Sequence, residues 1–454
     1  MRKYFGTDGI RRIANTELTP ELVYKVAKAG AYVLAKETGH TPTILIGRDT
    51  RLSGSLIESA MTAGFLSYGA NVKILDVIPT PAVAYLTKRF KADASVVISA
   101  SHNTYEFNGV KYFSNKGMKI SDELEEQIES VMDSGKIDEL TAVGEKIGVS
   151  EIRTDLLDEY VYFFRKNFEE ELENLDKSNF KVLIDTANGA TSIVAGKVFK
   201  VLGINHDIIN DTPDGININH NCGSTHLEQL KKGVTEGKYS LGIAYDGDGD
   251  RCLAVDELGN EIDGDKILAI ISNYMKSKGT LRKDTVVATV MSNLGLTKYG
   301  KDNNINIVQT KVGDRYVLEE MLKNGYNLGG EQSGHVIMLD YNPTGDGILT
   351  SLMLIRAILE STKKASDLAN IMRAYPQVLV NAKVSNDKKF DFDKDSEIVQ
   401  EIKMLEKEFE GNGRVLIRTS GTEPLVRVML EGEDQDYLKK RAEALAALIT
   451  KKLS

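Results

Sequence analysis

Cysteine is scarce in this sequence, which has only Cys222 and Cys252 among 454 residues. Two cysteines cannot form a disulfide framework, and their spacing fits no structural metal site. The 6 histidines are scattered, and no pair has the spacing of a catalytic zinc site. These absences indicate a protein of a reducing compartment, and we expect it in the cytoplasm.

Long apolar runs and an excess of basic residues are missing too. No segment approaches the ~20 apolar residues of a membrane span, and the opening sequence MRKYFGTDGIRR has no apolar signal-peptide core. Lys and Arg number 57 against 66 Asp and Glu, which leaves a net charge of −9. We therefore expect no membrane and no nucleic-acid partner, and any anion must bind in a local cationic pocket.

Several well-known catalytic loops are also absent, namely G-x-x-x-x-G-K-[ST], G-x-G-x-x-G after a strand, and G-x-S-x-G. What the chain contains instead is an alternation of short apolar runs and amphipathic stretches. Residues 42–49, 71–77 and 94–100 are expected to be strands, and residues 53–69 a helix that ends at Gly69. This order predicts βαβ units and a largely parallel sheet.

The chain is long enough for about three or four domains. The junctions of strand and polar loop at Gly47, Asp185 and Ser292 resemble one another, which indicates a triplicated α/β domain. The last part, from about Tyr375, shows strands followed by one terminal helix and is expected to be α+β. We place the domains at residues 1–150 (of which 133–148 form a linker), 151–255, 256–370 and 371–454.

Three carboxylates alternate with glycines in the segment AYDGDGDRC. Asp246, Asp248 and Asp250 would be spaced about 6.6 Å apart along a flat strand, but Gly247 and Gly249 let the backbone curl so that they converge. Converging carboxylates are stabilised by a hard divalent cation, and oxygen-only ligands favour Mg²⁺. A solvated acidic turn is one alternative, and an EF-hand loop is another, although the flanks look like strands rather than helices.

Small polar residues follow the apolar run at residues 96–98. Ser99, Ser101, His102 and Asn103 would lie at the mouth of a strand, where ordinary turn residues are the alternative interpretation. Residues two apart share a face of a strand, so Ser99 is expected to point the same way as Ser101 but one pleat deeper.

Two further loops have the composition of binding sites. RTSGTEPLVRV places hydroxyls and backbone N–H groups between Arg418 and Arg427, which suits a phosphate; the alternative is a glycine turn with surface arginines. GGEQSGH sets Glu331 and Ser333 among glycines, which suits sugar hydroxyls; the alternative is a polar turn. The segment VGDRYV is expected to make a further polar contact or to start a helix. Together these features indicate phosphoryl transfer on a small phosphorylated molecule.

The motifs ISASHN, DGDGDR, GEQSGH and RTSGTEP, in this order, resemble the four active-site motifs of the α-D-phosphohexomutases. The segments YFGTDGIR, GRDTRLSG, NCGSTH, TVMSNLGL and TKVGDRYV are most similar to the members that act on glucosamine phosphate. The resemblance covers essentially the whole chain. It implies three related α/β domains and a smaller α+β domain around a central cleft, with one active-site loop from each.

The same resemblance implies an isomerase that interconverts glucosamine 6-phosphate and glucosamine 1-phosphate through a phosphoserine and a bisphosphate intermediate. Such an enzyme feeds amino-sugar nucleotide and cell-wall precursor synthesis. The resemblance also implies one Mg²⁺ per chain, a sugar 1,6-bisphosphate activator, a kinase or bisphosphate donor for the serine, and a homodimer. Glucose or mannose phosphate as substrate, and a non-catalytic Mg²⁺-dependent sugar-phosphate-binding protein, remain as alternatives.

Residue by residue, the resemblance assigns Ser101 as the phosphoserine, and the remaining positions form three sets. The Mg²⁺ ligands would be Ser101, Asp246, Asp248 and Asp250. The catalytic neighbours of the serine would be Arg11, His102, Asn103 and Lys111. The substrate would be bound by Arg251, Glu331, Ser333, His335, Arg418, Ser420, Gly421, Thr422 and Arg427. Lys111 or His102 is expected to take the proton of the attacking hydroxyl.

The sequence departs from the family pattern at two positions of the serine loop. Related sequences usually read SHNP and then DNG, whereas this chain has Thr104 after Asn103 and Phe107 before Asn108. The loss of proline loosens the loop backbone, and Phe107 replaces an acid near the serine. Neither change touches the nucleophile or a metal ligand, so activity is expected.

Overall fold

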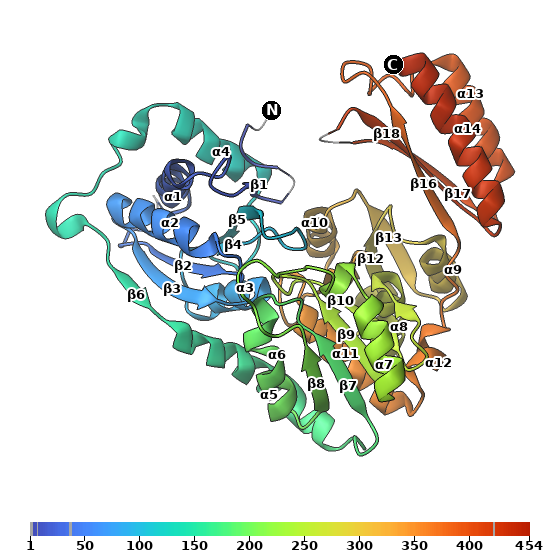
Figure 1. Cartoon of the computed structure of the whole chain (residues 1–454), viewed down its shortest axis with the longest axis horizontal. Helices are drawn as coiled ribbons and strands as arrows, with labels where there is room; N and C mark the ends of the chain where they lie inside the picture. The colour runs from blue at the N-terminus through green and yellow to red at the C-terminus, as the bar shows by residue number, and fades with distance from the viewer. Residues whose placement is uncertain (1–2, 7, 36–38, 421–422) are drawn as a thin grey trace. The chain divides into compact units, whose positions relative to one another are not determined.

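The computed structural model describes the whole chain except residues 1–2, 7, 36–38 and 421–422. Gly421 and Thr422 of the predicted phosphate loop therefore lie outside the described residues. The chain divides into two compact units (Figure 1). The first unit comprises Met1–Met291 and Asn306–Ile371, and the second comprises Ser292–Ile305 and Met372–Ser454.

The first unit begins with a six-stranded sheet. Its elements are β1 (Ile10–Ile13), α1 (Pro20–Ala35), β2 (Thr43–Arg48), α2 (Gly54–Tyr68), β3 (Asn71–Val77), α3 (Thr80–Arg89), β4 (Ala94–Ile98), β5 (Phe107–Ser114), α4 (Asp122–Asp133) and β6 (Ser150–Ile152). The order is β1-β5-β4-β2-β3-β6, with β5 antiparallel to both neighbours and the other pairs parallel. The three expected strands and the helix are confirmed, and Gly69 caps α2 with a φ of 104°. Figure 1 shows α1 and α2 on one face of the sheet and α3 on the other.

The segment expected to be a linker contains two short 3₁₀ turns, Lys136–Asp138 and Gly144–Lys146. It leads into β6, which pairs parallel with β3. The first sheet therefore continues to Ile152, just beyond the boundary that we placed at residue 150.

The second sheet has five strands. Its elements are α5 (Leu157–Glu173), β7 (Lys181–Asp185), α6 (Ala195–Val201), β8 (Asn205–Ile209), α7 (Glu228–Gly237), β9 (Leu241–Tyr245), β10 (Cys252–Asp256) and β11 (Glu261–Ile262). The order is β11-β10-β9-β7-β8, in which β7 is parallel to β8 and β9, and β10 is antiparallel to β9 and β11.

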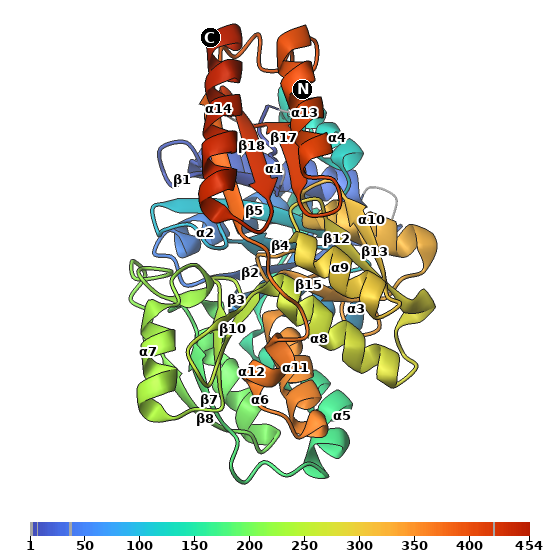
Figure 2. The same cartoon turned by 90° about the vertical axis from the view of Figure 1, so that its right-hand side faces the viewer.

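The third sheet has four strands in the order β13-β12-β14-β15. Its elements are α8 (Gly264–Ser277), β12 (Thr285–Thr289), β13 (Asn306–Thr310), α10 (Asp314–Asn324), β14 (Leu328–Gly330), β15 (Val336–Met338), α11 (Gly347–Ser361) and α12 (Ala365–Ala369). Helices α8 and α11 pack against each other and connect the second sheet to the third (Figure 2). Strands β4, β9 and β12 are buried at every residue, which is typical of strands covered by helices on both faces.

The three sheets share one topology, which confirms the predicted triplication. In each, a central strand (β2, β7 or β12) has parallel strands on both sides, and an antiparallel strand (β5, β10 or β15) follows on the same flank. The loops β4–β5, β9–β10 and β14–β15 are therefore equivalent. Each begins at the carboxyl end of a parallel strand, and each contains one of the predicted site motifs.

The second unit is an antiparallel sheet covered by two helices on one face (Figure 1). Its elements are α9 (Leu294–Asp302), β16 (Gln377–Lys383), α13 (Ser396–Glu408), β17 (Arg414–Thr419), β18 (Leu425–Glu431) and α14 (Gln435–Leu453). The prediction of a single terminal helix was wrong, because α13 lies between β16 and β17. Asp395 caps α13, and the buried Ile398 and Leu405 share its inner face. The α+β class is confirmed.

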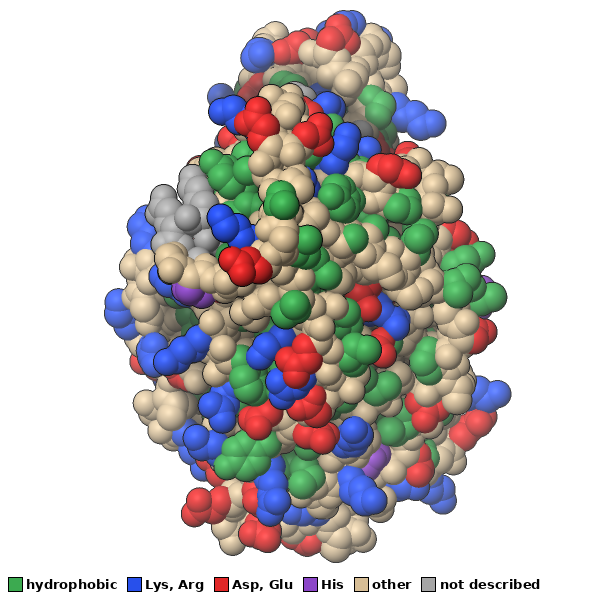
Figure 3. All heavy atoms as spheres, turned by 90° about the vertical axis from the view of Figure 1, so that its left-hand side faces the viewer, with side chains coloured by type: hydrophobic (Ala, Val, Ile, Leu, Met, Phe, Trp, Pro, Cys, Tyr) green, Lys and Arg blue, Asp and Glu red, His purple; other side chains and the backbone are tan. Residues whose placement is uncertain are grey.

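Acidic and basic side chains are interspersed on the face shown in Figure 3. Neither sign forms a continuous field there, as expected for a chain with a modest net charge of −9. Among the helices of the described residues, none combines the length and apolar character needed to cross a membrane.

Candidate functional site

The loop between β4 and β5 holds Ser101 in a fixed backbone conformation. Ser101 has a φ of 53°, in the left-handed region, and is 2% exposed. Its N–H donates to the Ser99 Oγ at 2.9 Å, and that hydroxyl donates to the Asp49 Oδ2 at 2.6 Å. Ser99 therefore lies beneath the loop as a support. The expected strand alternation does not continue to Ser101, because β4 ends at Ile98 and the chain turns.

The hydroxyl of Ser101 points at the carboxylates of the β9–β10 loop. Its Oγ donates to the Asp246 Oδ2 at 2.6 Å and lies 3.4 Å from the His102 Nδ1. Asp246, Asp248 and Asp250 are buried, and one oxygen from each lies within 4.8 Å of the others. The structure thus brings the predicted nucleophile and the predicted metal ligands together from two domains.

The carboxylate cluster has the properties of a cation site. Asp248 Oδ1 and Asp250 Oδ1 are buried and accept no hydrogen bond from any described residue. Burial, reinforced by Asp250 and Asp248, raises the pKa of Asp246 well above its ordinary value. A hard cation would bind the two oxygens that lack hydrogen-bond donors, and its charge would offset the repulsion between the carboxylates. The flanks are the antiparallel strands β9 and β10, which excludes the EF-hand alternative.

Lys111, on β5, is the cation that the structure itself places beside these carboxylates. Its Nζ lies 3.0 Å from the Asp248 Oδ2, 3.3 Å from the Asp8 Oδ2 and 3.8 Å from the Asp250 Oδ2. Burial alone would lower the pKa of Lys111, but the three carboxylates raise it above its ordinary value. Lys111 is therefore charged at neutral pH.

Arg11 reaches the Ser101 loop through Asn103, and His102 follows Ser101 in the chain. The Arg11 guanidinium donates to the Asn103 Oδ1 at 3.2 Å and to the Asp8 Oδ2 at 3.0 Å. Burial, followed by the charges of Arg251 and Arg11, lowers the pKa of His102 to about 4. His102 is therefore neutral over the physiological range.

The β14–β15 loop approaches the same region from the third sheet. The Glu331 Oε1 accepts from the Gly313 N–H at 3.1 Å, and the Ser333 Oγ donates to the Glu331 Oε2 at 3.4 Å. His335 is 3% exposed, and its Nδ1 lies 3.6 Å from the Asp250 Oδ2. Glu331 and Ser333 are half-buried, whereas His335 lies beneath them against the carboxylate cluster.

Arg251 closes the carboxylate loop. Its backbone N–H donates to the Asp246 Oδ1 at 3.1 Å. The side chain is half-buried, and its buried Nε atom has no hydrogen-bond partner among the described residues. The guanidinium is thus available to an anion at this site.

Sequence reasoning missed a half-buried lysine, Lys119, that connects the first and third sheets. The Lys119 Nζ lies 2.5 Å from the Asp8 Oδ1 and 2.6 Å from the Asp314 Oδ2. Asp314 also begins α10, so both expectations for the segment VGDRYV are met. The pairing of Lys119 with Asp314 spans 195 residues and leaves no local pattern that could have revealed it.

In the second unit, the predicted phosphate arginines face each other across two strands. Arg418 on β17 pairs in register with Arg427 on β18, and neither Nε atom has a hydrogen-bond partner among the described residues. Burial, followed by the charge of Arg427, lowers the pKa of Arg418. The Arg427 Nη2 donates to the Glu423 Oε2 at 3.2 Å, but the two adjacent guanidiniums keep their Nε donors for an anion such as phosphate. Ser420 is buried next to them.

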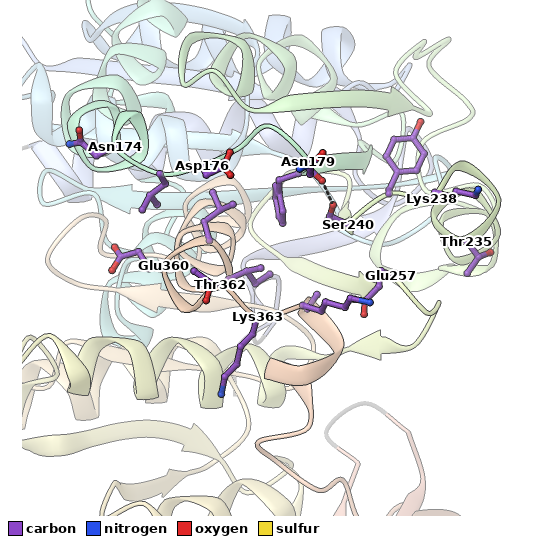
Figure 4. Close-up of a pocket in the computed structure, with 17 residues that line it drawn as sticks. Asn174, Asp176, Asn179, Thr235, Lys238, Ser240, Glu257, Glu360, Thr362 and Lys363 are labelled. Atoms are coloured by element: carbon purple, nitrogen blue, oxygen red, sulfur yellow. Dashed lines mark hydrogen bonds between the residues drawn. The ribbon is translucent and has the colours of Figure 1, made fainter.

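A cavity of about 910 Å³ lies at the opposite end of the second sheet, where β7 and β9 begin (Figure 4). Its acidic and basic side chains do not converge, and in Figure 4 Lys238 and Lys363 point in different directions. Glu360 is already engaged by Tyr274, at 2.7 Å. This cavity therefore has none of the chemistry found around Ser101.

Four family models match this chain in succession. They are the phosphoglucomutase/phosphomannomutase α/β/α domain I at residues 2–138, domain II at 158–259, domain III at 263–375 and the C-terminal domain at 379–448. Together they cover most of the chain.

Two relatives align with this chain over their full length. Proteins described as phosphoglucosamine mutase are 54% identical in Clostridium kluyveri and 55% identical in Acetivibrio thermocellus, with 100% of both chains covered. Among solved structures, a phosphoglucomutase/phosphomannomutase family protein from Burkholderia thailandensis has a TM-score of 0.80 at 21% identity, covering 99% of this chain and 98% of its own. An Aspergillus fumigatus N-acetylphosphoglucosamine mutase in complex with GlcNAc-6P and magnesium has a TM-score of 0.73 at 17% identity, covering 100% and 96%.

Proposed function

Because this chain belongs to the phosphoglucomutase/phosphomannomutase family, we propose that it is an isomerase that interconverts glucosamine 6-phosphate and glucosamine 1-phosphate. The name of the full-length relatives at 54–55% identity supports this substrate. The observation that carries the chemistry is the Ser101 hydroxyl, held 2.6 Å from a buried carboxylate of a three-aspartate cluster.

Ser101 would carry the phosphoryl group. In the first step, O1 of glucosamine 6-phosphate attacks the phosphorus, a P–O1 bond forms, the P–Oγ bond breaks, and the hydroxyl proton goes to a base. The resulting 1,6-bisphosphate turns over, and its C6 phosphoryl returns to Ser101. The burial of Ser101 supports this role, because excluding water limits hydrolysis of the phosphoserine.

Asp246, Asp248 and Asp250 would bind one Mg²⁺, together with a phosphoryl oxygen on Ser101. When bound, the ion supplies positive charge for the transferring phosphoryl group. The oxygen-only donor set and the two buried oxygens without hydrogen bonds support this choice of metal.

Lys111 and His102 are the two groups that could take the proton. His102 is neutral and lies 3.4 Å from the Ser101 Oγ. Asp248, Asp8 and Asp250 raise the pKa of Lys111, and of these Asp248 and Asp250 are proposed to bind the cation. Lys111 is charged at neutral pH, so it could take the proton only after it had released its own.

The remaining predicted residues would bind the substrate. Glu331 and Ser333 would receive the sugar hydroxyls, with His335 supporting the carboxylate cluster beneath. Arg251 would contact an anionic group beside the metal loop. The non-reacting phosphate would be held by Arg418, Ser420, Gly421, Thr422 and Arg427. Unused guanidinium donors in Arg251, Arg418 and Arg427 support an anionic ligand.

A steady-state assay tests the proposal. The purified protein should convert glucosamine 6-phosphate with Mg²⁺ and a trace of sugar 1,6-bisphosphate, and convert glucose and mannose phosphates more slowly. Ser101→Ala should lose nearly all turnover yet still bind sugar phosphate, and peptide mapping should place the phosphoryl group on Ser101. Preferred turnover of glucose phosphate would overturn the substrate, and near-normal turnover by Ser101→Ala would overturn the phosphoserine.

Other features of the working enzyme stay predictions. We infer a cytoplasmic location, which agrees with the two buried free cysteines. The serine needs a first phosphoryl group from a bisphosphate or a kinase, and phosphopeptide mapping from cells would test this. Sedimentation analysis would test the predicted homodimer.

A further inference from the structure

We propose that Arg51 is a positioning residue that holds the backbone of the Ser101 loop in its reactive shape. This inference rests on the proposed role of Ser101 as phosphoryl carrier. Arg51 follows β2, and its side chain is fully buried with 0% exposure. Arginine is rarely buried to this degree unless every donor is used.

The guanidinium of Arg51 donates four hydrogen bonds to main-chain oxygens of the Ser101 loop. The Nη2 atom donates to the carbonyl of Ser101 at 3.0 Å and to that of Asn103 at 2.8 Å. The Nη1 atom donates to the carbonyls of Phe107, at 3.0 Å, and Thr104. A planar fork with fixed donor directions can reach four oxygens only when the loop has one particular curvature.

The charge of Arg51 is balanced by Asp49, which also supports the loop from below. The Arg51 Nε donates to the Asp49 Oδ2 at 2.8 Å, and the same oxygen accepts from the Ser99 hydroxyl at 2.6 Å. Ser99 in turn accepts from the Ser101 N–H. The N–H and the C=O of Ser101 are thus both tied to one buried network.

This network offsets the backbone strain at Ser101. A left-handed conformation costs a non-glycine residue free energy and persists only where surrounding contacts determine it. The clamp is also independent of the two departures from the family pattern, Thr104 and Phe107. Arg51 binds the carbonyl oxygens of these two residues, so the identity of their side chains does not alter the clamp.

Asn219, from the second α/β domain, is a second side chain that donates hydrogen bonds to the same loop. The Asn219 Nδ2 donates to the carbonyls of Ser101 and Asn103, both at 2.9 Å. Asn219 lies between β8 and β9, so it reaches the loop independently of Arg51. Arg51 and Asn219 thus both donate to the carbonyl of Ser101 from different domains. Accurate phosphoryl transfer requires that the reacting residue is held in this fixed way.

Arg51→Lys is the central test. Lysine keeps the charge opposite Asp49, but its single ammonium cannot reach four carbonyls. We expect kcat to fall by about 100-fold, as for a displacement of about 1 Å, with KM for glucosamine 6-phosphate little changed. Amide hydrogen exchange in residues 99–107 should quicken, and the Tm should fall, because carbonyl oxygens of the loop lose their buried donors.

Asn219→Gly keeps the test decisive if Arg51→Lys does not fold. Asn219 has a φ of 58°, which glycine adopts without strain, so this variant removes the Nδ2 donor alone. It should lower kcat with KM retained and quicken exchange in the same loop. Arg48→Lys is the matched control, since Arg48 pairs with Glu58 and Asp76 and does not bind the loop.

The outcomes separate this inference from the proposed function. Wild-type kcat and loop exchange in both Arg51→Lys and Asn219→Gly would overturn the positioning role, even with an active enzyme. A raised KM with unchanged kcat would also overturn it. A wild-type protein without mutase activity would overturn the proposed function, whereas the exchange measurement would still report whether Arg51 holds the loop.

Discussion

Gly247 lies where the predicted metal loop meets the Ser101 loop, and alanine at this position tests how close the two loops must come. A Cβ atom on Gly247 would lie 2.6 Å from the carbonyl oxygen of Ser101 and 2.8 Å from the Asn219 Nδ2. Carbon–oxygen contacts settle at about 3.3–3.6 Å. The Ser101 carbonyl must therefore recede by about 0.7–1 Å.

The displacement is large enough to measure in turnover. A misplacement of about 1 Å can cost about 100-fold in rate, so kcat of Gly247→Ala should fall by about this factor. Overpacking of this kind costs about 1–3 kcal/mol of stability, which a thermal melt would detect. Gly247 is not among the residues with positive φ, so the effect is steric rather than conformational.

Gly196→Ala is the control in the same domain. Its Cβ would meet the flexible end of Ile208 at 2.9 Å, and it sits in α6, where alanine is favoured over glycine. We expect it to keep full activity. A Gly247→Ala enzyme with wild-type kcat would show that the two loops do not need the close approach seen here.

Three further outcomes are expected. Asp248→Asn should weaken Mg²⁺ binding and turnover while the fold persists, and EDTA should abolish wild-type activity reversibly; full activity in excess EDTA would remove the metal from the mechanism. Arg418→Ala should raise KM by about 10- to 150-fold, since a charge-assisted hydrogen bond contributes about 1.5–3 kcal/mol; an unchanged KM would contradict the phosphate site. The pKa of His102 is near 6.5 in the unfolded chain and about 4 in the folded protein, so between these pH values the unfolded chain binds the proton more tightly. The free energy of unfolding should therefore fall as the pH drops from about 6.5 to about 4. Urea unfolding at pH 7 and pH 5 should therefore show a smaller loss for His102→Gln, and equal losses would refute the shift.

The elements with a clear local signal were predicted correctly from the sequence. Strands such as β3 and β4 are short apolar runs between turn residues, and α2 ends at a glycine. Helix α13 was not predicted, although its local signal is present in the N-cap Asp395 and the apolar residues Ile398 and Leu405. The triplication was visible only as a faint likeness of three junctions, since strand order depends on contacts that are distant in sequence.

The candidate site was predictable where chemistry is concentrated in short motifs. The Ser-His-Asn and Asp-Gly-Asp-Gly-Asp segments drew attention because their side chains have few structural uses in combination. Arg51 and Asn219 escaped notice because they bind backbone oxygens, 50 and 118 residues away from Ser101. A residue that recognises main-chain atoms needs no matching side chain, so its partner leaves no trace in the sequence.

Charge balance connects the fold to the proposed chemistry. Around Ser101 the first unit buries several carboxylates, and it offsets them with Lys111 and Lys119 from the first domain. A phosphoryl group on Ser101 adds a charge of about −2 beside these carboxylates, which would increase the repulsion among them. A divalent cation adds +2 at the same place, so the two together leave the balance unchanged. Phosphoserine and metal should therefore strengthen each other's binding.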